Sequence, residues 1–398
     1  MIPGFYTYQL RHNVSSKQII EPGLAAISEV LATLGNPHEA LRVIHVAGTN
    51  GKGSTVAYTA ALCQAHGLTT GTFMSPAILD VHDQIQINGH AITPVEMSAI
   101  FEQLKPFSNQ LTEFELLTVV ALLYFSQHGV DVAVVEAGLG GLEDATNVVK
   151  PVASIITSIA LEHTRFLGTT LAQIAYQKGG IIKHAPAIVG RVPKEAEQVL
   201  RALAKDVPYY QIGEAIEVTP TSYSFAQVTL TNMTRALQGV HQADNMALAL
   251  TAFLQLGVPM DKELARRTIA TTTLPARFEQ VLPNVFFDGA HNAASVEQLV
   301  ATIRKNYPTT PVTFVVGILA DKAIEEVLRL LEQVSQRFYF VSFANERAAD
   351  AEDVMLVSRA AHKAVLTDVV DFLRQEREGI TVVTGSLYLL ADLRKVII

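Results

Sequence analysis

Residues 44–54, Ile-His-Val-Ala-Gly-Thr-Asn-Gly-Lys-Gly-Ser, constrain the fold more than any other part of the chain. This segment starts with strand-forming residues, contains three glycines within six residues, and leads into a helical stretch at residues 55–66. Glycines let backbone N–H groups approach phosphate oxygens, a helix N-terminus favours negative charge, and a lysine adds a cation. The segment therefore predicts a phosphate-binding loop, although not a strict Walker A motif, because Gly53 separates Lys52 from Ser54.

Composition favours two folded domains and excludes some partners. A chain of 398 residues exceeds the usual size of one domain, at about 150 residues per domain. Hydrophobic residues make up 49% and charged residues 17%, which supplies buried cores and argues against a disordered chain. The net charge of −8, without a block rich in lysine and arginine, argues against nucleic acid as a partner.

The single cysteine and the N-terminus are typical of a cytoplasmic protein. Cys63 has no second cysteine to pair with, and its small neighbours on the predicted helix indicate a core thiol. Residues 1–10 lack the basic and apolar regions of a signal peptide, and no apolar run reaches the ~18 residues that suggest a membrane span. We therefore expect a soluble cytoplasmic protein with no membrane partner.

Strand-forming segments alternate with helical ones in the first part of the chain. The pattern predicts strands at residues 41–46, 70–74, 130–135, 152–158 and 187–189, and helices at residues 94–104, 114–128 and 171–183. Helical stretches between such strands are typical of βαβ units and a parallel sheet. Ligands of such sheets bind beyond the carboxyl ends of the strands.

The later segments predict a hairpin, a linker and a second α/β domain. β-Alternation from residue 209 to about residue 234 favours a hairpin attached to the main sheet, and helical periodicity returns at residues 243–256. A polar, β-branched run into proline at residues 271–275 indicates a linker. Further strands are predicted at residues 285–287, 312–316, 338–342 and 380–383. The fold class is therefore α/β, with a parallel-sheet P-loop ATPase domain at residues 1–273 and a smaller Rossmann-like domain at residues 274–398.

Three polar residues follow strands of the first domain. Glu136 ends the strand at residues 130–135, where a carboxylate beside a phosphate loop suits Mg²⁺ on a nucleotide, and the alternative is a solvated loop acid. His163 follows the next predicted strand, but a lone histidine is more typical of a surface or packing residue. Ser75, followed by proline, is by its local sequence an ordinary turn.

Four further residues lie near helix ends, strands or the linker. Lys178, followed by two glycines, has the pattern of a helix C-cap with a terminal cation. Asp288 and His291 again place an acid and a histidine just past a strand. Arg277 comes directly after the linker, where an arginine of the second domain is placed to bind a phosphate.

Taken together, these segments resemble the folylpolyglutamate synthase/dihydrofolate synthase family, within the Mur-ligase superfamily of ATP-dependent amide ligases. The resemblance spans nearly the whole chain and rests on the order and spacing of short motifs. These motifs lie at residues 34–37, 48–54, 113–115, 139–141, 144–147, 166–168, 178–183, 288–292, 319–322 and 384–388.

The resemblance implies a Mur-ligase-type ATP-binding domain followed by a glutamate-ligase domain. In the family's reaction ATP phosphorylates a substrate carboxylate, the amine of glutamate attacks the acyl phosphate, and phosphate leaves. Lys52, Lys178 and His291 are implied as catalytic, with Lys178 carrying a carbamate that supports a second Mg²⁺. The other implied contacts are Asn50, Gly51, Lys52, Gly53 and Ser54 with the phosphates, Ser75, Glu136 and His163 with Mg²⁺, Asn245, Arg277 and Asp288 with ATP, and His291 and Ser386 with glutamate.

The chain departs from the family pattern mainly around the cleft of the first domain. Ala77 replaces a frequent histidine, Gln84 a frequent arginine and Leu142 another arginine. Glu162 stands where aspartate is usual, and Ala276 stands where glycine often precedes the arginine. None of these changes removes a metal or phosphate contact, so they affect the identity of the acid substrate more than the ATP chemistry.

The expected activity is the addition of L-glutamate to the γ-carboxylate of a reduced folate, by a monomer with ATP and two Mg²⁺ ions. A bifunctional enzyme that also joins dihydropteroate to glutamate remains an alternative. Ala77 and Gln84 leave open a ligase that acts on a non-folate acid. The non-enzyme alternative is a paralogue that binds nucleotide but does not catalyse a reaction. The presence of Lys52, Glu136 and Lys178 argues against it.

Overall fold

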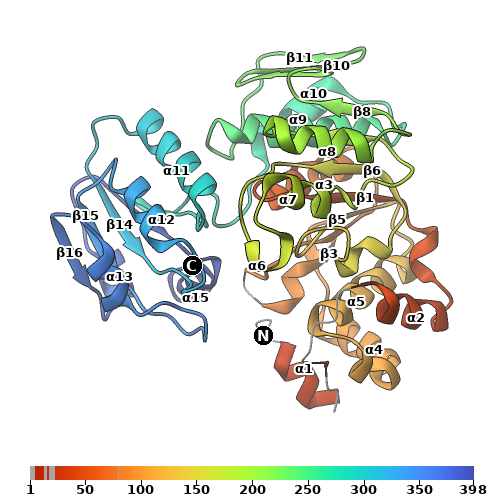
Figure 1. Cartoon of the computed structure of the whole chain (residues 1–398), viewed down its shortest axis with the longest axis horizontal. Helices are drawn as coiled ribbons and strands as arrows, with labels where there is room; N and C mark the ends of the chain where they lie inside the picture. The colour runs from red at the N-terminus through yellow and green to blue at the C-terminus, as the bar shows by residue number, and fades with distance from the viewer. Residues whose placement is uncertain (1–4, 13–15, 18–22, 79) are drawn as a thin grey trace. The chain divides into compact units, whose positions relative to one another are not determined.

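The structure, a computed structural model, describes residues 5–12, 16–17, 23–78 and 80–398 (Figure 1). Residues 1–4, part of the N-terminal segment considered above for a signal peptide, lie outside the described residues. The chain divides into two compact units. Unit 1 comprises Met1–Ala236 with Gln242–Thr272, and unit 2 comprises Leu237–His241 with Thr273–Ile398.

Unit 1 is built on an eight-stranded sheet, with the order β4-β3-β2-β5-β1-β6-β7-β8 in the described part of the chain. Its strands are β1 (Val43–Ala47), β2 (Thr70–Phe73), β3 (Ile85–Ile87), β4 (His90–Ala91), β5 (Val132–Glu136), β6 (Pro151–Ile156), β7 (Ala187–Val189) and β8 (Tyr209–Gln211). Neighbours from β2 to β8 are parallel, whereas β3 and β4 are antiparallel. The segments that follow β2, β5, β1 and β6 therefore all leave the same edge of the sheet.

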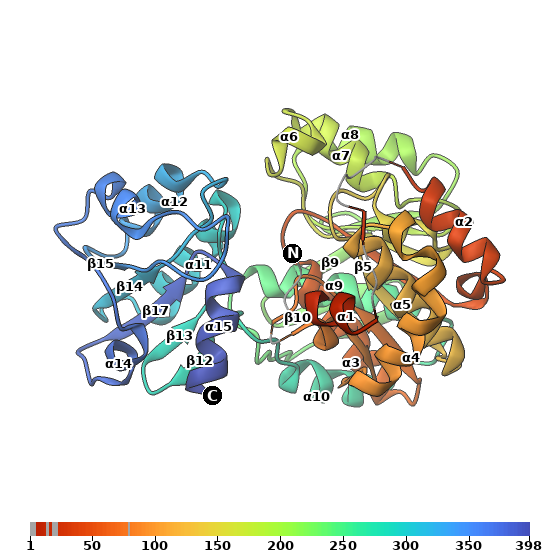
Figure 2. The ribbon, with the colours of Figure 1, turned by 90° about the horizontal axis from the view of Figure 1, so that it is seen from below.

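Helices cover both faces of this sheet (Figures 1 and 2). The helices of the chain up to residue 271 are α1 (Phe5–His12), α2 (Ala25–Thr33), α3 (Lys52–Ala65), α4 (Pro94–Leu104), α5 (Glu113–Gln127), α6 (Thr164–Leu167), α7 (Leu171–Gly179), α8 (Lys194–Leu203), α9 (His241–Leu254) and α10 (Lys262–Thr271). On one face, α2, α4 and α5 share a core with β1, β2 and β5, and α7 and α8 pack on β6 and β7. Helix α3 covers the other face, with the ring of His66 4.5 Å from that of Phe253 at the end of α9.

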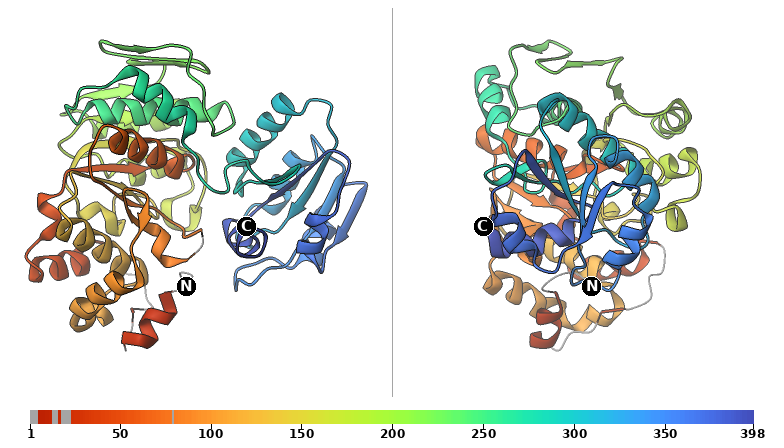
Figure 3. Two further views of the ribbon diagram at one scale, coloured as in Figure 1. Left: turned by 180° about the vertical axis from the view of Figure 1, so that it is seen from behind. Right: turned by 90° about the vertical axis from the view of Figure 1, so that its left-hand side faces the viewer.

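Unit 2 is a smaller α/β sandwich around a six-stranded sheet of order β12-β13-β17-β14-β15-β16 (Figure 3). Its strands are β12 (Glu279–Leu282), β13 (Val285–Phe287), β14 (Val312–Val316), β15 (Arg337–Phe340), β16 (His362–Val365) and β17 (Ile380–Thr384). Its helices are α11 (Ala293–Asn306), α12 (Ile324–Leu331), α13 (Ala351–Val357), α14 (Val369–Arg374) and α15 (Leu387–Ile397). Side chains alternate between the two faces, so Phe314 packs with α11, α12 and α13, and Val315 packs with α14 and α15.

The predicted α/β architecture is confirmed, and one local prediction is wrong. The segment after residue 209 does not add a hairpin to the main sheet. Among the described residues of that segment only β8 joins the main sheet, and β9 (Ile216–Thr219), β10 (Ser222–Phe225) and β11 (Val228–Leu230) form a separate antiparallel sheet. The predicted helix end at Lys178 is confirmed, because α7 ends at Gly179 with Gly180 as its C-cap, and the lysine in this last turn is 4% exposed.

The single cysteine of the chain lies in the core of unit 1, as its small neighbours in the sequence predicted. Cys63 on α3 is fully buried, and burial raises the pKa of its thiol to about 12, as expected of a core thiol. Within the described residues, no helix combines the length and the apolar character that a membrane span requires.

Candidate active site

The phosphate-binding loop predicted from the sequence lies between β1 and α3. Residues 48–51 connect the strand directly to the first residue of the helix, Lys52. Gly51 is the N-cap residue with a φ of +88°, and no side chain caps this helix end. The first N–H groups of a helix lack partners within it, and the helix dipole makes this end positive. The start of α3 is therefore chemically suited to an anion.

The loop is held against the segment that follows β6. Gly48 has a φ of +148°, and a Cβ atom there would lie 1.9 Å from Oγ1 of Thr157. The Thr157 hydroxyl donates to the carbonyl of Asn50 at 2.6 Å, and the N–H of Asn50 donates to Oγ of Ser158 at 2.9 Å. Thr157 and Ser158 were not predicted as site residues, because the predicted strand at residues 152–158 included both, whereas β6 ends at Ile156.

Helix α9 supplies a second support for the loop. Asn245 is buried, and a Cβ atom at Gly51 would lie 2.4 Å from its Oδ1 atom. The amide of Asn245 donates to Oε1 of Gln242 at 3.0 Å, and Gln242 donates to the hydroxyl of Ser54 at 3.2 Å. The structure thus brings Asn245 against the phosphate-binding loop, together with Gln242, which the sequence analysis did not single out.

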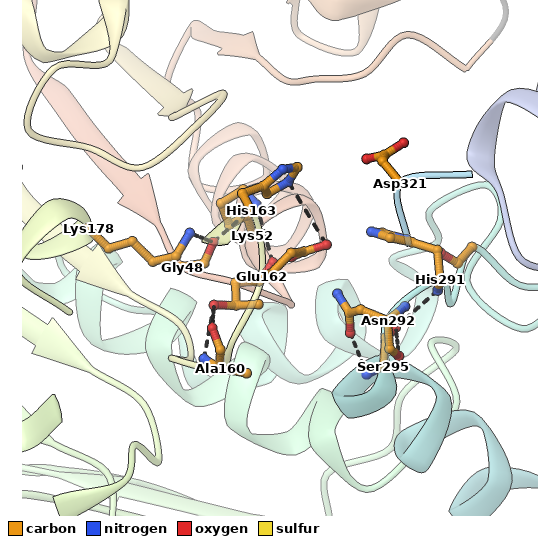
Figure 4. A network of polar contacts seen from close by, with 12 residues as sticks. Gly48, Lys52, Ala160, Glu162, His163, Lys178, His291, Asn292, Ser295 and Asp321 are labelled. Atoms are coloured by element: carbon orange, nitrogen blue, oxygen red, sulfur yellow. Dashed lines mark hydrogen bonds and ion pairs between the residues drawn. The ribbon is translucent and has the colours of Figure 1, made fainter. Parts of the chain in front are cut away.

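Two lysines donate to one carbonyl group of the loop. Nζ of Lys52 lies 3.2 Å from the oxygen of Gly48, and Nζ of Lys178, on α7, lies 3.0 Å from the same oxygen. Figure 4 shows the Lys178 side chain pointing at Gly48. Burial and the nearby Lys52 cation lower the pKa of Lys178 to about 7. A substantial fraction of this amine is therefore neutral near pH 7.

The three predicted metal ligands follow neighbouring parts of one sheet edge. Ser75 follows β2, Glu136 is the last residue of β5, and His163 lies beyond β6. Glu136 is buried and its Oε1 atom lies 3.8 Å from Nζ of Lys52. His163 has a left-handed φ of +51° and pairs with Oε1 of Glu162 at 3.9 Å (Figure 4).

These ligand types suit a metal that is shared with a nucleotide. Within the described residues there is no group of three or more His, Cys, Asp and Glu side chains that could hold a metal ion. Mg²⁺ is usually bound through one or two carboxylates, with substrate phosphates and water completing its shell. One buried carboxylate, Glu136, beside the phosphate-binding loop fits this mode better than a complete protein cage.

In unit 2, Asp288 and Arg277 lie in one folded turn. The carboxylate of Asp288 accepts the N–H groups of Phe278 at 2.9 Å and of Ala290 at 3.0 Å, and Arg277 donates to the carbonyl of Ala276 at 3.0 Å. Burial raises the pKa of Asp288, against the effect of Arg277. Ala276 has a φ of +58°, a conformation in which glycine would be unstrained, so the family's frequent glycine has a local explanation.

The two predicted glutamate-binding residues also have local roles in unit 2. Nδ1 of His291 lies 2.8 Å from the carbonyl oxygen of Gly289, and its backbone N–H donates to the hydroxyl of Ser295 at 3.1 Å (Figure 4). Ser386 is buried and caps α15 by accepting the N–H of Tyr388 at 3.2 Å. His291 follows β13 and Ser386 follows β17, and these two strands are parallel neighbours.

Comparison with known proteins places this architecture in one family. The family model described as "Mur ligase middle domain" matches residues 46–253, and the one described as "Dihydrofolate synthetase, C-terminal domain" matches residues 276–396. The chain is 36% identical to the dihydrofolate synthase/folylpolyglutamate synthase of Bacillus subtilis, over 94% of this chain and 95% of that protein. The chain belongs to the folylpolyglutamate synthase/dihydrofolate synthase family.

Other members of the folylpolyglutamate synthase/dihydrofolate synthase family are similar over the same length. The folylpolyglutamate synthase of Lacticaseibacillus casei is 31% identical over 94% of both chains. The solved structure of Escherichia coli FolC with DHPP and ADP has a TM-score of 0.90 and 30% identity, over 99% of this chain and 97% of that chain. The Yersinia pestis bifunctional enzyme complexed with AMPPNP and Mn ion has a TM-score of 0.89 and 28% identity, over 99% and 98% of the two chains.

Gly51 offers a test of the family's phosphate-binding loop without a functional assay. Gly51→Ala should lower the free energy of unfolding because φ is +88° and the new Cβ would lie 2.4 Å from Oδ1 of Asn245. Gly67→Ala is the matched control, with a φ of +83° and no atom within 4 Å of the new Cβ. We expect Gly67→Ala to lose about 1 kcal/mol through backbone strain, and Gly51→Ala to lose at least ~1 kcal/mol more through the clash. Equal losses in denaturant unfolding would contradict the close contact between the loop and Asn245.

Proposed function

We propose that this chain catalyses the ATP-dependent addition of L-glutamate to the γ-carboxylate of reduced folates through an acyl phosphate. The observation that carries the proposal is the shared Gly48 carbonyl, at which Lys52 and the buried Lys178 meet beside the phosphate-binding loop. A carboxylate and ATP repel each other, so their reaction requires positive charge where the phosphoryl group transfers, supplied by Lys52 and by metal ions that Lys178 helps to hold once carbamylated. Membership of the family supports folate as the acid.

In this mechanism the loop and α3 bind the phosphates of ATP. The N–H groups of Gly51, Lys52 and Ser54 donate to phosphate oxygens, and Lys52 leaves the Gly48 carbonyl to neutralise the transferring group. Thr157 and Asn245 keep the loop in the conformation that presents these N–H groups. ATP and a divalent metal are proposed here partly because family members have been solved with ADP and with AMPPNP and Mn ion.

Mg²⁺, when bound, would neutralise the negative charge that the phosphate groups and the acid bring to the site. Ser75, Glu136 and His163 are the residues that would hold it, and a second ion is proposed beside Lys178. A carbamate forms when a neutral amine adds CO₂, and the pKa of Lys178 is lowered to about 7, mainly by burial. The low pKa therefore favours carbamylation of Lys178, which would convert a buried cation into an anionic metal ligand.

The amine of glutamate then attacks the acyl phosphate, forming the amide bond and releasing phosphate. Asp288 and Arg277 are proposed to contact ATP, and His291 and Ser386 to place the incoming glutamate. This division assigns ATP binding to a domain of residues 1–273 and glutamate ligation to a domain of residues 274–398. We also propose that the enzyme is a cytoplasmic monomer and that it has no nucleic-acid partner.

A second candidate function is the additional joining of dihydropteroate to glutamate. The specific observation in its favour is that the Bacillus subtilis relative, 36% identical to this chain, is named for both activities.

Two of the departures from the family pattern lie in the loop between β2 and β3: Ala77 is 3% exposed and Gln84 is 2% exposed. Both replacements therefore change the interior of that loop.

The test is phosphate release from ATP and Mg²⁺ with L-glutamate and one of three acids: tetrahydrofolate, a one-carbon-substituted folate or dihydropteroate. Release with the folates alone is expected for a folylpolyglutamate synthase, and release with dihydropteroate as well for a bifunctional enzyme. Omission of glutamate should abolish the signal in both cases. No release with any of the acids, from protein that binds ATP, would contradict the proposal.

A further inference from the structure

The loop between β2 and β3 is fastened to the first helix of the chain through a histidine. His82 lies in a short 3₁₀ helix, Val81–Gln84, and its Nδ1 atom is 2.7 Å from Oδ1 of Asp80. On the other side of the ring, Nε2 forms a short hydrogen bond with the hydroxyl of Tyr8, on α1. Because a carboxylate only accepts, Nδ1 of His82 donates to Asp80, and Nε2 is the ring nitrogen that pairs with the Tyr8 hydroxyl.

Helix α1 is itself fixed to α4 by aromatic packing. The ring of Tyr8 stacks on Phe101 with centroids 5.3 Å apart, and His12 stacks on the same ring at 6.0 Å. Phe5 is fully buried and contacts Phe101 edge to face at 5.7 Å, and Nδ1 of His12 pairs with Glu102 at 2.7 Å. Tyr8 is only 4% exposed, so its hydroxyl is presented to His82 from a well-packed position.

Hydrogen bonds within the described part of this loop join its start to its end. The N–H of Met74 donates to the carbonyl of Gln84 at 2.9 Å, which joins the start of the loop to its end. The N–H of Ile78 donates to both carboxylate oxygens of Asp83, at 3.2 and 3.0 Å. A displacement of His82 would therefore be transmitted to Ser75, which follows Met74.

The β2–β3 loop lies beside the part of the sheet edge that the phosphate-binding loop does not cover. In the order β2-β5-β1-β6, the phosphate-binding loop lies at the ends of β1 and β6, and the β2–β3 loop begins at the end of β2. Glu136 ends the strand between them, β5. Since the phosphate-binding loop covers the ends of β1 and β6, we place the approach of the attacking carboxylate at the ends of β5 and β2.

We propose that Tyr8 and His82 are positioning residues for the ligase reaction, which hold residues 74–78 and 80–84 in the conformation that admits the acid substrate. This inference rests on the proposed function. It assigns to the N-terminal helix a part in substrate binding that no motif in its own sequence indicates. Asp80 orients the imidazole, and Tyr8 joins that imidazole to the core through Phe101.

The first test measures the loop without any substrate. Tyr8→Phe keeps the ring on Phe101 and removes only the hydroxyl, so amide hydrogen exchange in residues 74–78 and 80–84 should become about fivefold faster, the equivalent of one hydrogen bond. Tyr124→Phe is the matched control, because Tyr124 is similarly buried in the same core and donates to Glu96 at 3.3 Å, away from this loop. Unchanged exchange in Tyr8→Phe, or an equal effect in the control, would overturn the proposal.

The second test separates positioning from general stability. In Tyr8→Phe the KM for the acid should rise about fivefold and the KM for ATP by less, because the released loop contains Ser75 but not the phosphate-binding loop. Tyr8→Phe combined with His82→Gln should behave like His82→Gln alone, since that variant already removes the contact with the Tyr8 hydroxyl as well as the one with Asp80. A KM for the acid equal to that of the unmodified protein, or additive effects, would overturn the positioning role.

The two measurements also separate this inference from the proposed function. If the unmodified protein releases no phosphate with any of the folates, the proposed function fails and the positioning role fails with it. The exchange result then still decides whether Tyr8 anchors the loop. Turnover by the unmodified protein with unchanged kinetics in Tyr8→Phe would overturn the positioning role alone.

Discussion

Replacing Lys52 with alanine is expected to reduce kcat by at least about 10³-fold, because one preorganised cation at a developing charge contributes that order of rate. Nζ of Lys52 lies beside the loop carbonyls and 3.8 Å from Glu136, so its loss also leaves this buried carboxylate without its cation. Steady-state phosphate release with saturating substrates measures the effect.

The control for Lys52→Ala is a lysine of unit 1 that is exposed. Lys150→Ala removes a 68% exposed side chain that pairs with Glu39 at 3.0 Å, and we expect no change in kcat. The free energy of unfolding of Lys52→Ala should differ from that of the unmodified protein by less than about 1.5 kcal/mol, since the lysine is 19% exposed and its ion pair with Glu136 is long, at 3.8 Å. Near-normal turnover in Lys52→Ala would remove the phosphate-binding role from this loop.

Replacing Lys178 with alanine is expected to reduce kcat by about 10²-fold or more, and small carboxylic acids should restore part of it, because they resupply the missing anion. The position is 4% exposed and next to Gly48, so alanine leaves a space that a short carboxylate fills. Turnover is measured against acetate concentration at constant ionic strength.

Lys183 provides a demanding comparison for this rescue. Its Nζ atom donates to the carbonyls of Asn147 and Val149, the latter at 2.8 Å, and burial lowers its pKa as well. Lys183→Ala should therefore lower stability without any response to acetate. Full activity of Lys178→Ala without an additive would contradict the carbamate, and equal rescue of both variants would show a general salt effect.

The sequence predicted most of the regular elements because local pattern and final environment agree there. Strand β7 and helix α4 have the predicted bounds, since one is a short apolar run and the other begins with a Thr-Pro pair that caps it. The alternation of β9, β10 and β11 was recognised, but periodicity does not say which sheet a strand joins. Strand β4 has only two residues, too few for a pattern.

The candidate site could be predicted where its residues are consecutive in the sequence, but not where residues far apart in the sequence contact each other. The strand, loop and helix around Lys52 could be read from adjacent residues. The helix end at Lys178 could be read in the same way, but the contact of its Nζ atom with the carbonyl oxygen of Gly48 could not. Gly180 is also required by a close approach, since a Cβ atom there would lie 2.4 Å from Cα of Leu142. Such packing depends on the tertiary fold, as does the contact between Gly51 and Asn245.

The buried state of Cys63 makes this chain convenient for site-specific labelling. A thiol whose pKa is raised to about 12 by burial has almost no thiolate at neutral pH and reacts slowly with maleimides. A cysteine introduced at an exposed position such as Leu356, which is 75% exposed, would then be modified selectively in the unmodified background. Fluorescent or spin labels can therefore be attached to unit 2 without first removing the native cysteine.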